Sequence, residues 1–202
     1  MEKIWLKHYP AGVPATIDVE KFASLVALLD DSFSAYRSRT AYKFMGKAIS
    51  FEQLDAWSRA FAAWLQAEGF AKGDRIALMM PNVPQYPAAV AGVLRAGCVV
   101  VNVNPLYTPR ELEHQLKDSG ASAIVIIENF ATTLQAVLPR VALKRIVVTA
   151  LGDLLGAPKS WLVNTVVRRV KKLVPPFDLP GSLRFNAVLA AGRGLPLRPP
   201  SV

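Results

Sequence analysis

The sequence predicts an α/β fold in which a parallel sheet carries helices on both faces. Four apolar and mostly β-branched segments recur at intervals of 22 to 25 residues: 76–80, 98–103, 123–127 and 145–149. Segments with helical spacing of apolar residues fill the intervals between them. Because only crossover helices can hide such near-continuous apolar strands from water on both sides, this alternation is typical of a doubly wound parallel sheet.

The residues before this repeat predict a lead-in, a helix and a hairpin. Residues 1–23 contain two prolines and little periodicity, which favours an extended lead-in. Ser24 then opens an amphipathic helix, and we expect it to pack through the apolar residues that recur at helical spacing: Leu25, Leu28, Leu29, Phe33 and Tyr36. The β-like segments 41–45 and 48–50 flank Gly46, which predicts a hairpin because glycine tolerates a positive φ in a tight turn.

Capping residues mark the boundaries of the predicted helices, both before the repeat and within it. Ser50 with Gln53, and Thr108 with Glu111, have the spacing of a capping box, in which each side chain satisfies a backbone N–H of the first turn. A further helix is predicted over 85–95. Glycines that can adopt the left-handed conformation mark the ends of these helices: Gly69, Gly97 and Gly120.

The regular pattern weakens in the last quarter of the chain. Residues 159–174 predict a helix with valines on one side and four basic residues on the other: Arg168, Arg169, Lys171 and Lys172. Six of the 15 prolines follow Val174, which favours a linker. The expected division is a lead-in at 1–23, an α/β subdomain at 24–150, and a basic amphipathic helix with a Pro-rich linker at 151–202 that leads to a missing remainder.

Composition excludes several classes of protein. The chain is 52% hydrophobic, so it is not an intrinsically disordered protein. Its single cysteine, Cys98, excludes an intrachain disulfide framework and favours a reducing compartment. The sequence shows neither a secretory signal nor the roughly 20 consecutive apolar residues of a membrane span. We therefore expect a cytoplasmic protein.

The positive charge is concentrated towards the end of the sequence. Residues 1–150 hold 16 basic and 13 acidic residues, whereas residues 151–202 hold 8 basic and 2 acidic residues. A nucleic-acid-binding domain would place a basic stripe on its folded body. The distribution therefore predicts a local anionic partner and no nucleic acid.

Two segments carry a resemblance to a known family: AISFEQLDAWSRAFAAWL and GDRIALMMPNVPQYPAAVAGVLRAGCVVVNVNPLYTPRELEHQLKDSGASAIVI. They resemble the N-terminal part of bacterial long-chain fatty-acid CoA ligases, which belong to the acyl-adenylate-forming, AMP-binding superfamily. The resemblance runs from Trp5 to about Phe185 and is strongest between Ser50 and Ile127. The run VNVNPLYTPRELEHQLKDSG separates it from the wider superfamily, where this region is more variable. The resemblance also implies that the chain has the fold of the N-terminal subdomain of these enzymes, incomplete here.

This resemblance implies a two-step reaction that uses ATP, Mg²⁺ and coenzyme A. The carboxylate of a long-chain fatty acid attacks the α-phosphate and releases pyrophosphate, and the thiol of coenzyme A then displaces AMP. A carboxylate that approaches a polyanionic phosphate needs backbone donors, a lysine and a cation to stabilise the developing charge. In the family these donors come from a loop of the form YTGGTTGxxKG, and the sequence contains neither this loop nor the fingerprints GxGxxG and GxxxxGK[ST].

We therefore expect an N-terminal fragment of such a ligase that is inactive by itself. No catalytic, cofactor-binding or metal-binding residue is assigned within it. The sequence ends with LPLRPPSV, about where family members lead into the phosphate-binding loop. The alternatives are a non-catalytic module that binds a membrane or forms a homo-oligomer, and a remnant without an independent role.

Several polar residues have a plain structural interpretation. Thr108 and Arg110 lie at a helix N-terminus that favours anions, but capping explains the threonine. Glu111 and His114 form a single E-x-x-H pair, which is fewer than the three or four ligands that a metal site needs. Cys98 lies in a predicted buried strand and is expected to pack in the core.

The basic helix is the strongest candidate for an independent role. We predict that its valine side, with Trp161, faces the acyl-chain boundary of a membrane while its basic side meets anionic headgroups. The candidate membrane contacts are Trp161, Arg168, Arg169, Lys171 and Lys172. In the alternative interpretation, the valines pack on the protein body and the charges are solvated. Membrane contact would place the protein at the inner face of the cell membrane.

Overall fold

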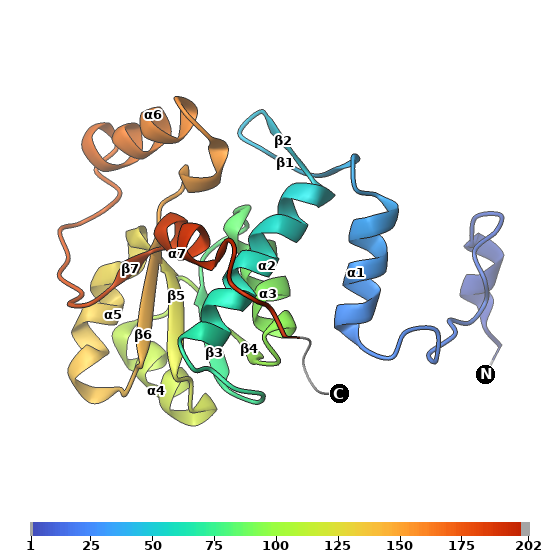
Figure 1. The fold of residues 1–202 in the computed structure, drawn as a ribbon, viewed down its shortest axis with the longest axis horizontal. Coiled ribbons are helices and arrows are strands. Elements are labelled where there is room, and N and C mark those ends of the chain that lie inside the picture. The colour runs from blue at the N-terminus through green and yellow to red at the C-terminus, as the bar shows by residue number, and fades with distance from the viewer. Residues whose placement is uncertain (1, 199–202) are drawn as a thin grey trace.

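A five-stranded parallel sheet forms the centre of the computed structural model, which describes residues 2–198 (Figure 1). The strand order is β4-β3-β5-β6-β7, with β3 (Arg75–Met79), β4 (Val99–Asn102), β5 (Ala123–Ile127), β6 (Arg145–Thr149) and β7 (Leu183–Arg184). Every neighbouring pair is parallel, and Ile76 of β3 lies opposite Val100 on one side and Ala123 on the other. The predicted α/β fold with a parallel sheet is confirmed, and β7 adds an edge strand that the sequence pattern did not indicate.

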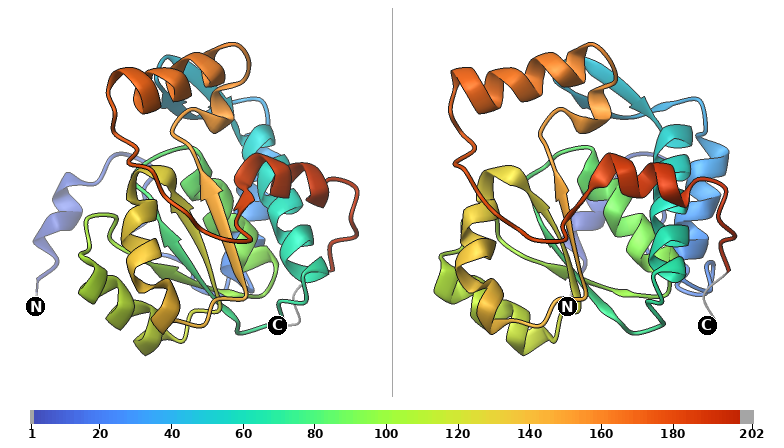
Figure 2. Two further views of the ribbon diagram at one scale, coloured as in Figure 1. Left: turned by 90° about the vertical axis from the view of Figure 1, so that its left-hand side faces the viewer. Right: turned by 60° about the vertical axis from the view of Figure 1, so that its left-hand side comes forward.

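Helices cover both faces of the sheet (Figure 2). One layer contains α2 (Phe51–Ala67), α3 (Gln85–Arg95) and α7 (Phe185–Gly192), and the other contains α4 (Pro109–Ser119) and α5 (Ala131–Val137). Successive residues of a strand point to opposite faces. Accordingly Ile76 and Leu78 pack into the first layer, whereas Ala77 and Met79 pack into the second. All five residues of β5 are buried, as expected for a strand covered on both sides.

The predicted helix caps are confirmed. The Ser50 and Thr108 side chains accept hydrogen bonds from the N–H groups of Gln53 and Glu111, whose side chains in turn accept from the two cap residues. Gly120 closes α4 in the left-handed conformation, with φ +60°. These caps fix where α2 and α4 begin, and therefore how the chain leaves β2 and β4.

A helix and a hairpin lie beside α2 and α3. α1 (Leu25–Ala35) begins at Ser24, and β1 (Thr40–Phe44) pairs antiparallel with β2 (Lys47–Ser50) as predicted. Arg95 of α3 is buried and pairs with Asp30 of α1 and Asp55 of α2, which ties the three helices together. The expectation that α1 packs along its whole apolar stripe is wrong in part. Phe33 is buried and Leu29 is half-buried against residues of β2, α2 and α3, whereas three members remain exposed: Leu25, Leu28 and Tyr36.

The segment after β6 contains the predicted basic helix and, beyond it, more structure than the expected linker. α6 (Lys159–Thr165) and a π-helical segment (Val166–Val170) lie within the predicted helix 159–174, and β7 and α7 follow where a linker was expected. α7 packs against α2 so closely that a Cβ at Gly192 would overlap the carbonyl oxygen of Ala60. The prolines in this segment do not prevent α7 from forming. Its apolar residues have helical spacing and are buried in the core between α2 and the sheet: Phe185, Val188 and Leu189.

The lead-in is mostly irregular and exposed. It contains one 3₁₀ helix, Ile4–His8, and lies apart from the sheet at the right of Figure 1. Within residues 2–198, none of the helices combines the length and apolar character needed to cross a bilayer.

Candidate functional site

Polar side chains gather at the carboxyl edge of the sheet, the edge at which ligands bind in open α/β folds. Glu128 follows β5 directly and is only 1% exposed. Its two carboxylate oxygens accept hydrogen bonds from Arg168 Nε at 2.8 Å and from an Arg168 terminal nitrogen at 2.7 Å. Arg184, at the end of β7, adds a third contact at 3.2 Å. The buried carboxylate thus connects three segments that are distant in sequence.

A second group of polar residues follows β6. Gln85 is fully buried and its Nε2 donates to Thr149 Oγ1 at 3.1 Å and to the Ala150 carbonyl at 2.8 Å. Asp153 accepts from Thr149 Oγ1 at 3.0 Å and from Asn164 Nδ2 at 3.1 Å. Because Asn164 lies in α6, this network and the Glu128 pair hold the same helical segment against the sheet.

These polar groups hold segments of the protein together and do not form a reaction centre. We call the hydrogen-bonded set Glu128, Arg168, Arg184, Asp153 and Asn164 the polar clamp. The Glu128 side chain raises the pKa of the Arg168 guanidinium through hydrogen bonds, so this cation stays charged. Residues 2–198 contain no group of three His, Cys, Asp or Glu side chains that could hold a metal ion. Since the carboxylates at this edge already accept hydrogen bonds from protein groups, the residues present do not fit a site for MgATP.

The helical segment that follows, 159–170, presents only one side to the protein. Val167 is buried and Val163 and Val166 are half-buried, so these three valines pack on the protein body, whereas Val170 is 68% exposed. These three valines follow the alternative interpretation, whereas Val170 and Trp161 of the predicted membrane side remain exposed, so contact of this segment with a membrane stays a prediction. On the outward side Trp161 is 70% exposed and Leu162 is 56% exposed.

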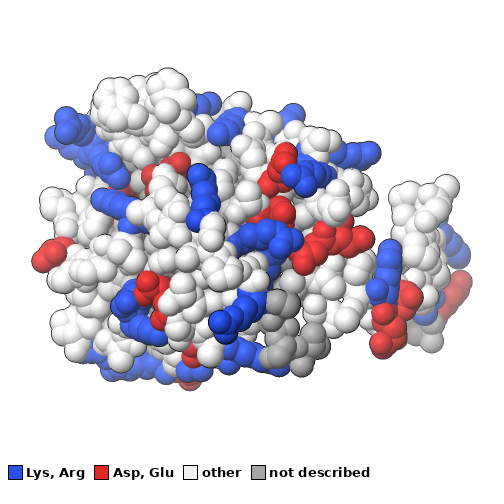
Figure 3. Space-filling model, viewed as in Figure 1, with Lys and Arg blue, Asp and Glu red and all other residues white. Residues whose placement is uncertain are grey.

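The other candidate membrane contacts are divided between two environments. Arg168 is occupied by Glu128, whereas Arg169, Lys171 and Lys172 are exposed. Figure 3 shows basic side chains gathered at the upper left, beside the end of this helical segment. A hollow of about 450 Å³ lies beside this segment and is lined by Trp161, Asn164, Thr165, Arg168 and Arg169. Its indole and guanidinium groups suit an anion with an apolar neighbour.

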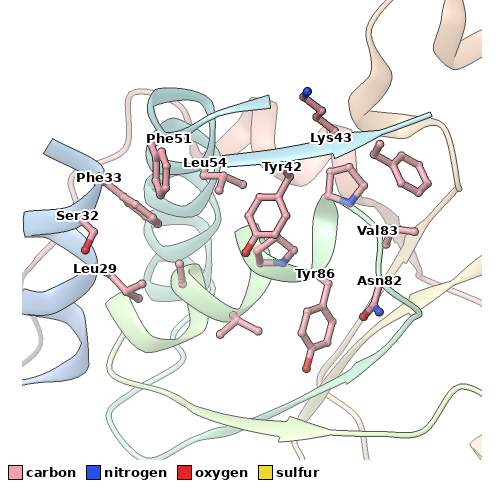
Figure 4. Close-up of a pocket in the computed structure, with 15 residues that line it drawn as sticks. Leu29, Ser32, Phe33, Tyr42, Lys43, Phe51, Leu54, Asn82, Val83 and Tyr86 are labelled. Carbon is pink, nitrogen blue, oxygen red and sulfur yellow. The ribbon is translucent and has the colours of Figure 1, made fainter. Parts of the chain in front are cut away.

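A larger and more apolar pocket lies between α1, β1 and the start of α3 (Figure 4). It has a volume of about 660 Å³. Phe33 and Leu54 lie at one end and Tyr86 and Asn82 at the other, with the Tyr42 ring between them. The Tyr86 hydroxyl donates to Asn102 at 2.7 Å, and the other polar residues of the lining are Ser32, Tyr42, Lys43 and Asn82. This pocket can hold apolar groups, but it contains no acid–base pair for chemistry.

The remaining residues identified from the sequence have structural roles. Thr108 donates hydrogen bonds to the Glu111 carboxylate and lowers its pKa, as a cap does. Burial raises the pKa of the Cys98 thiol to about 11, with a smaller contribution from Asp74. Sequence reasoning missed Glu128, Gln85 and Arg184. The position of Glu128 directly after an apolar strand was the available signal, but its partners come from distant segments.

Comparison with known proteins places this fold among enzymes. The profile described as "AMP-binding enzyme" matches residues 29–183. The chain belongs to the AMP-binding enzyme family. Within that family it is 52% identical to a long-chain-fatty-acid–CoA ligase of Yersinia pestis, over 100% of this chain and 36% of the relative. A ligase of the same name from Escherichia coli O157:H7 is 52% identical over 95% of this chain and 34% of its own length.

A solved structure agrees with this assignment at the level of the fold. A benzoate CoA ligase from Burkholderia xenovorans LB400 superimposes with a TM-score of 0.63 and 21% identity, over 87% of this chain and 29% of the other. The predicted resemblance to bacterial long-chain fatty-acid CoA ligases is confirmed. This AMP-binding family member spans about a third of the length of the curated relatives it matches.

Proposed function

We propose that the chain supplies the N-terminal α/β part of a long-chain fatty-acid CoA ligase. Identity of 52% to the Yersinia pestis relative, extending over the whole chain, is the observation that supports this. The reaction is activation of a fatty acid by ATP with Mg²⁺, followed by transfer of the acyl group to coenzyme A. This chain contributes the parallel sheet and its clamped carboxyl edge, and the phosphate-binding groups come from polypeptide beyond it.

The isolated chain does not catalyse this reaction in our proposal. Its carboxyl-edge carboxylates are engaged by Arg168, Arg184 and Asn164, and the sequence holds no glycine-rich loop with a lysine to stabilise a triphosphate. A transition state with developing charge on phosphate would therefore find no preorganised donors.

A chimera tests this proposal directly. The full chain of 202 residues would be joined to the part of the Yersinia pestis relative that follows its matched region, and pyrophosphate release with ATP, Mg²⁺ and palmitate would be measured. We expect activity from the chimera and from the intact relative, and none from the isolated chain. A folded but inactive chimera contradicts the proposed role, and turnover by the isolated chain contradicts its inactivity.

A second candidate function is contact with an anionic membrane. The observation that favours it is the outward surface of 159–172, where Trp161 and Leu162 are exposed beside Arg169, Lys171 and Lys172. Co-sedimentation with vesicles of phosphatidylcholine, with and without phosphatidylglycerol, tests it. We expect binding that requires the anionic lipid and weakens with salt. Binding that depends on neither the anionic lipid nor the salt concentration argues against it.

Homo-oligomerisation stays a prediction, to be measured by sedimentation velocity.

A further inference from the structure

The hairpin tip and the start of α6 are held together, although they are more than 100 residues apart in sequence. Figures 1 and 2 show the turn between β1 and β2 beside the start of α6 in each view. Lys159, the first residue of α6, donates to the Met45 carbonyl oxygen at the tip. In the reverse direction, Lys47 of β2 donates to the carbonyl oxygens of Leu154 and Leu155, at 3.3 and 2.9 Å. These reciprocal contacts join the two elements into one surface.

The two segments share an unusual charge composition. Residues 40–51 and 154–177 contain no Asp or Glu, although the whole chain has 15. They contain seven basic residues: Lys43, Lys47, Lys159, Arg168, Arg169, Lys171 and Lys172. Among residues 2–198, Arg168 is the member of this set that pairs with a carboxylate. The joint surface is therefore complementary to an anionic partner.

The same surface exposes apolar side chains at the hairpin end. Met45 is 48% exposed and adopts φ +47°, a left-handed conformation that is uncommon for residues other than Gly, Asn and Asp. A polar residue would suit both the backbone and the solvent at this turn. Instead the sequence has a methionine there. Its backbone carbonyl oxygen accepts a hydrogen bond from Lys159, in the helix that carries Trp161 and Leu162. Apolar side chains beside unpaired cations are the combination found in interfacial membrane elements.

We propose that the hairpin tip and α6 form a single docking face for an anionic bilayer. Met45, Trp161 and Leu162 enter the boundary of the acyl chains, and the exposed cations contact lipid phosphates: Lys43, Arg169, Lys171 and Lys172. This inference rests on the proposed membrane function and extends it to a second element. A free phosphate ion would satisfy the cations but would leave the three apolar side chains in water, so the bilayer is the better partner.

An environment-sensitive dye at the tip tests whether the hairpin takes part. Met45→Cys in the full chain provides the attachment site, because Cys98 is buried and its thiol, with a pKa of about 11, reacts slowly. The control is Ile17→Cys in the lead-in, which is 83% exposed. With vesicles that contain phosphatidylglycerol, we expect a blue shift of the dye at position 45 and none at position 17. Inorganic phosphate alone should shift neither.

Partition measurements with unlabelled variants complete the test. Met45→Asn keeps a residue that tolerates the left-handed turn, and it should weaken vesicle partition roughly fivefold, whereas Ile17→Asn should leave it unchanged. Replacing Arg169, Lys171 and Lys172 together by Gln should weaken it on the order of a hundredfold. If the triple variant loses binding while the tip variant and the tip dye show no effect, the two-element face is wrong and membrane contact by the helix stands. If the unmodified chain fails to bind anionic vesicles, membrane contact itself is wrong.

Discussion

α6 and α7 both follow β6, yet they are attached to the sheet by different kinds of interaction. α7 buries Phe185, Val188 and Leu189 against α2 and the strands beneath it. In the segment 159–170 only Val167 is buried, and hydrogen bonds to Glu128, Asp153 and the Met45 carbonyl oxygen add to its attachment. Burial of apolar side chains attaches α7 to the protein, whereas hydrogen bonds of a few polar atoms in the polar clamp attach α6. The clamp leaves the outward side of α6 free for a partner.

The largest expected loss of stability comes from weakening the attachment of α7 to the core. Phe185 is fully buried and its ring lies tilted against the ring of Phe61, with 5.5 Å between ring centroids. Phe185→Ala should lower the free energy of unfolding by about 3–5 kcal/mol, because it removes buried apolar surface and leaves a cavity. Urea denaturation measures this loss, and Trp161→Ala is the matched truncation of an exposed aromatic residue. A loss below about 1 kcal/mol would mean that α7 is not part of the cooperative core.

The next largest loss of stability is expected where α7 lies closest to α2. Gly192→Ala adds a Cβ that would overlap the Ala60 carbonyl oxygen, and backbone at that position cannot move cheaply. We expect a destabilisation of about 1–3 kcal/mol, measured by the same denaturation. Ala191→Ser, one residue earlier on the exposed side, should change stability by less than about 0.5 kcal/mol. Equal effects of the two variants would show that helix–helix spacing does not matter here.

The elements that the sequence predicted well are those whose signals are local. Both capping boxes join residues three apart, so their pattern carries the whole interaction. α7 was missed because it has only eight residues and follows a proline-rich stretch, and β7 because its two residues are defined by pairing with β6. The clamp was missed for a different reason. Glu128 and Arg168 are 40 residues apart, and only the tertiary fold brings them together.

A smaller effect should follow from opening the polar clamp. Glu128→Gln leaves Arg168 and Arg184 without a carboxylate, although both side chains are substantially exposed and water can solvate them. After allowing for this screening, we expect a loss of about 1–2 kcal/mol in unfolding free energy. Adding Arg168→Gln should cost less than the sum of the single changes, since the pair is then removed together. Strict additivity in this cycle would show that the two groups do not interact.

The smallest effect on stability is expected at Trp161, where a substitution should change membrane partition but not the stability of the fold. Trp161 is 70% exposed and makes no aromatic pair among the described residues, so Trp161→Ala should change the free energy of unfolding by less than about 0.5 kcal/mol. The same variant should weaken partition into anionic vesicles, because the indole is a favoured interfacial group. Val167→Ala is the matched inward change, and it should lower stability with less effect on partition. If Trp161→Ala instead destabilised the fold and left vesicle binding intact, the outward side of α6 would be a packing surface and not a docking surface.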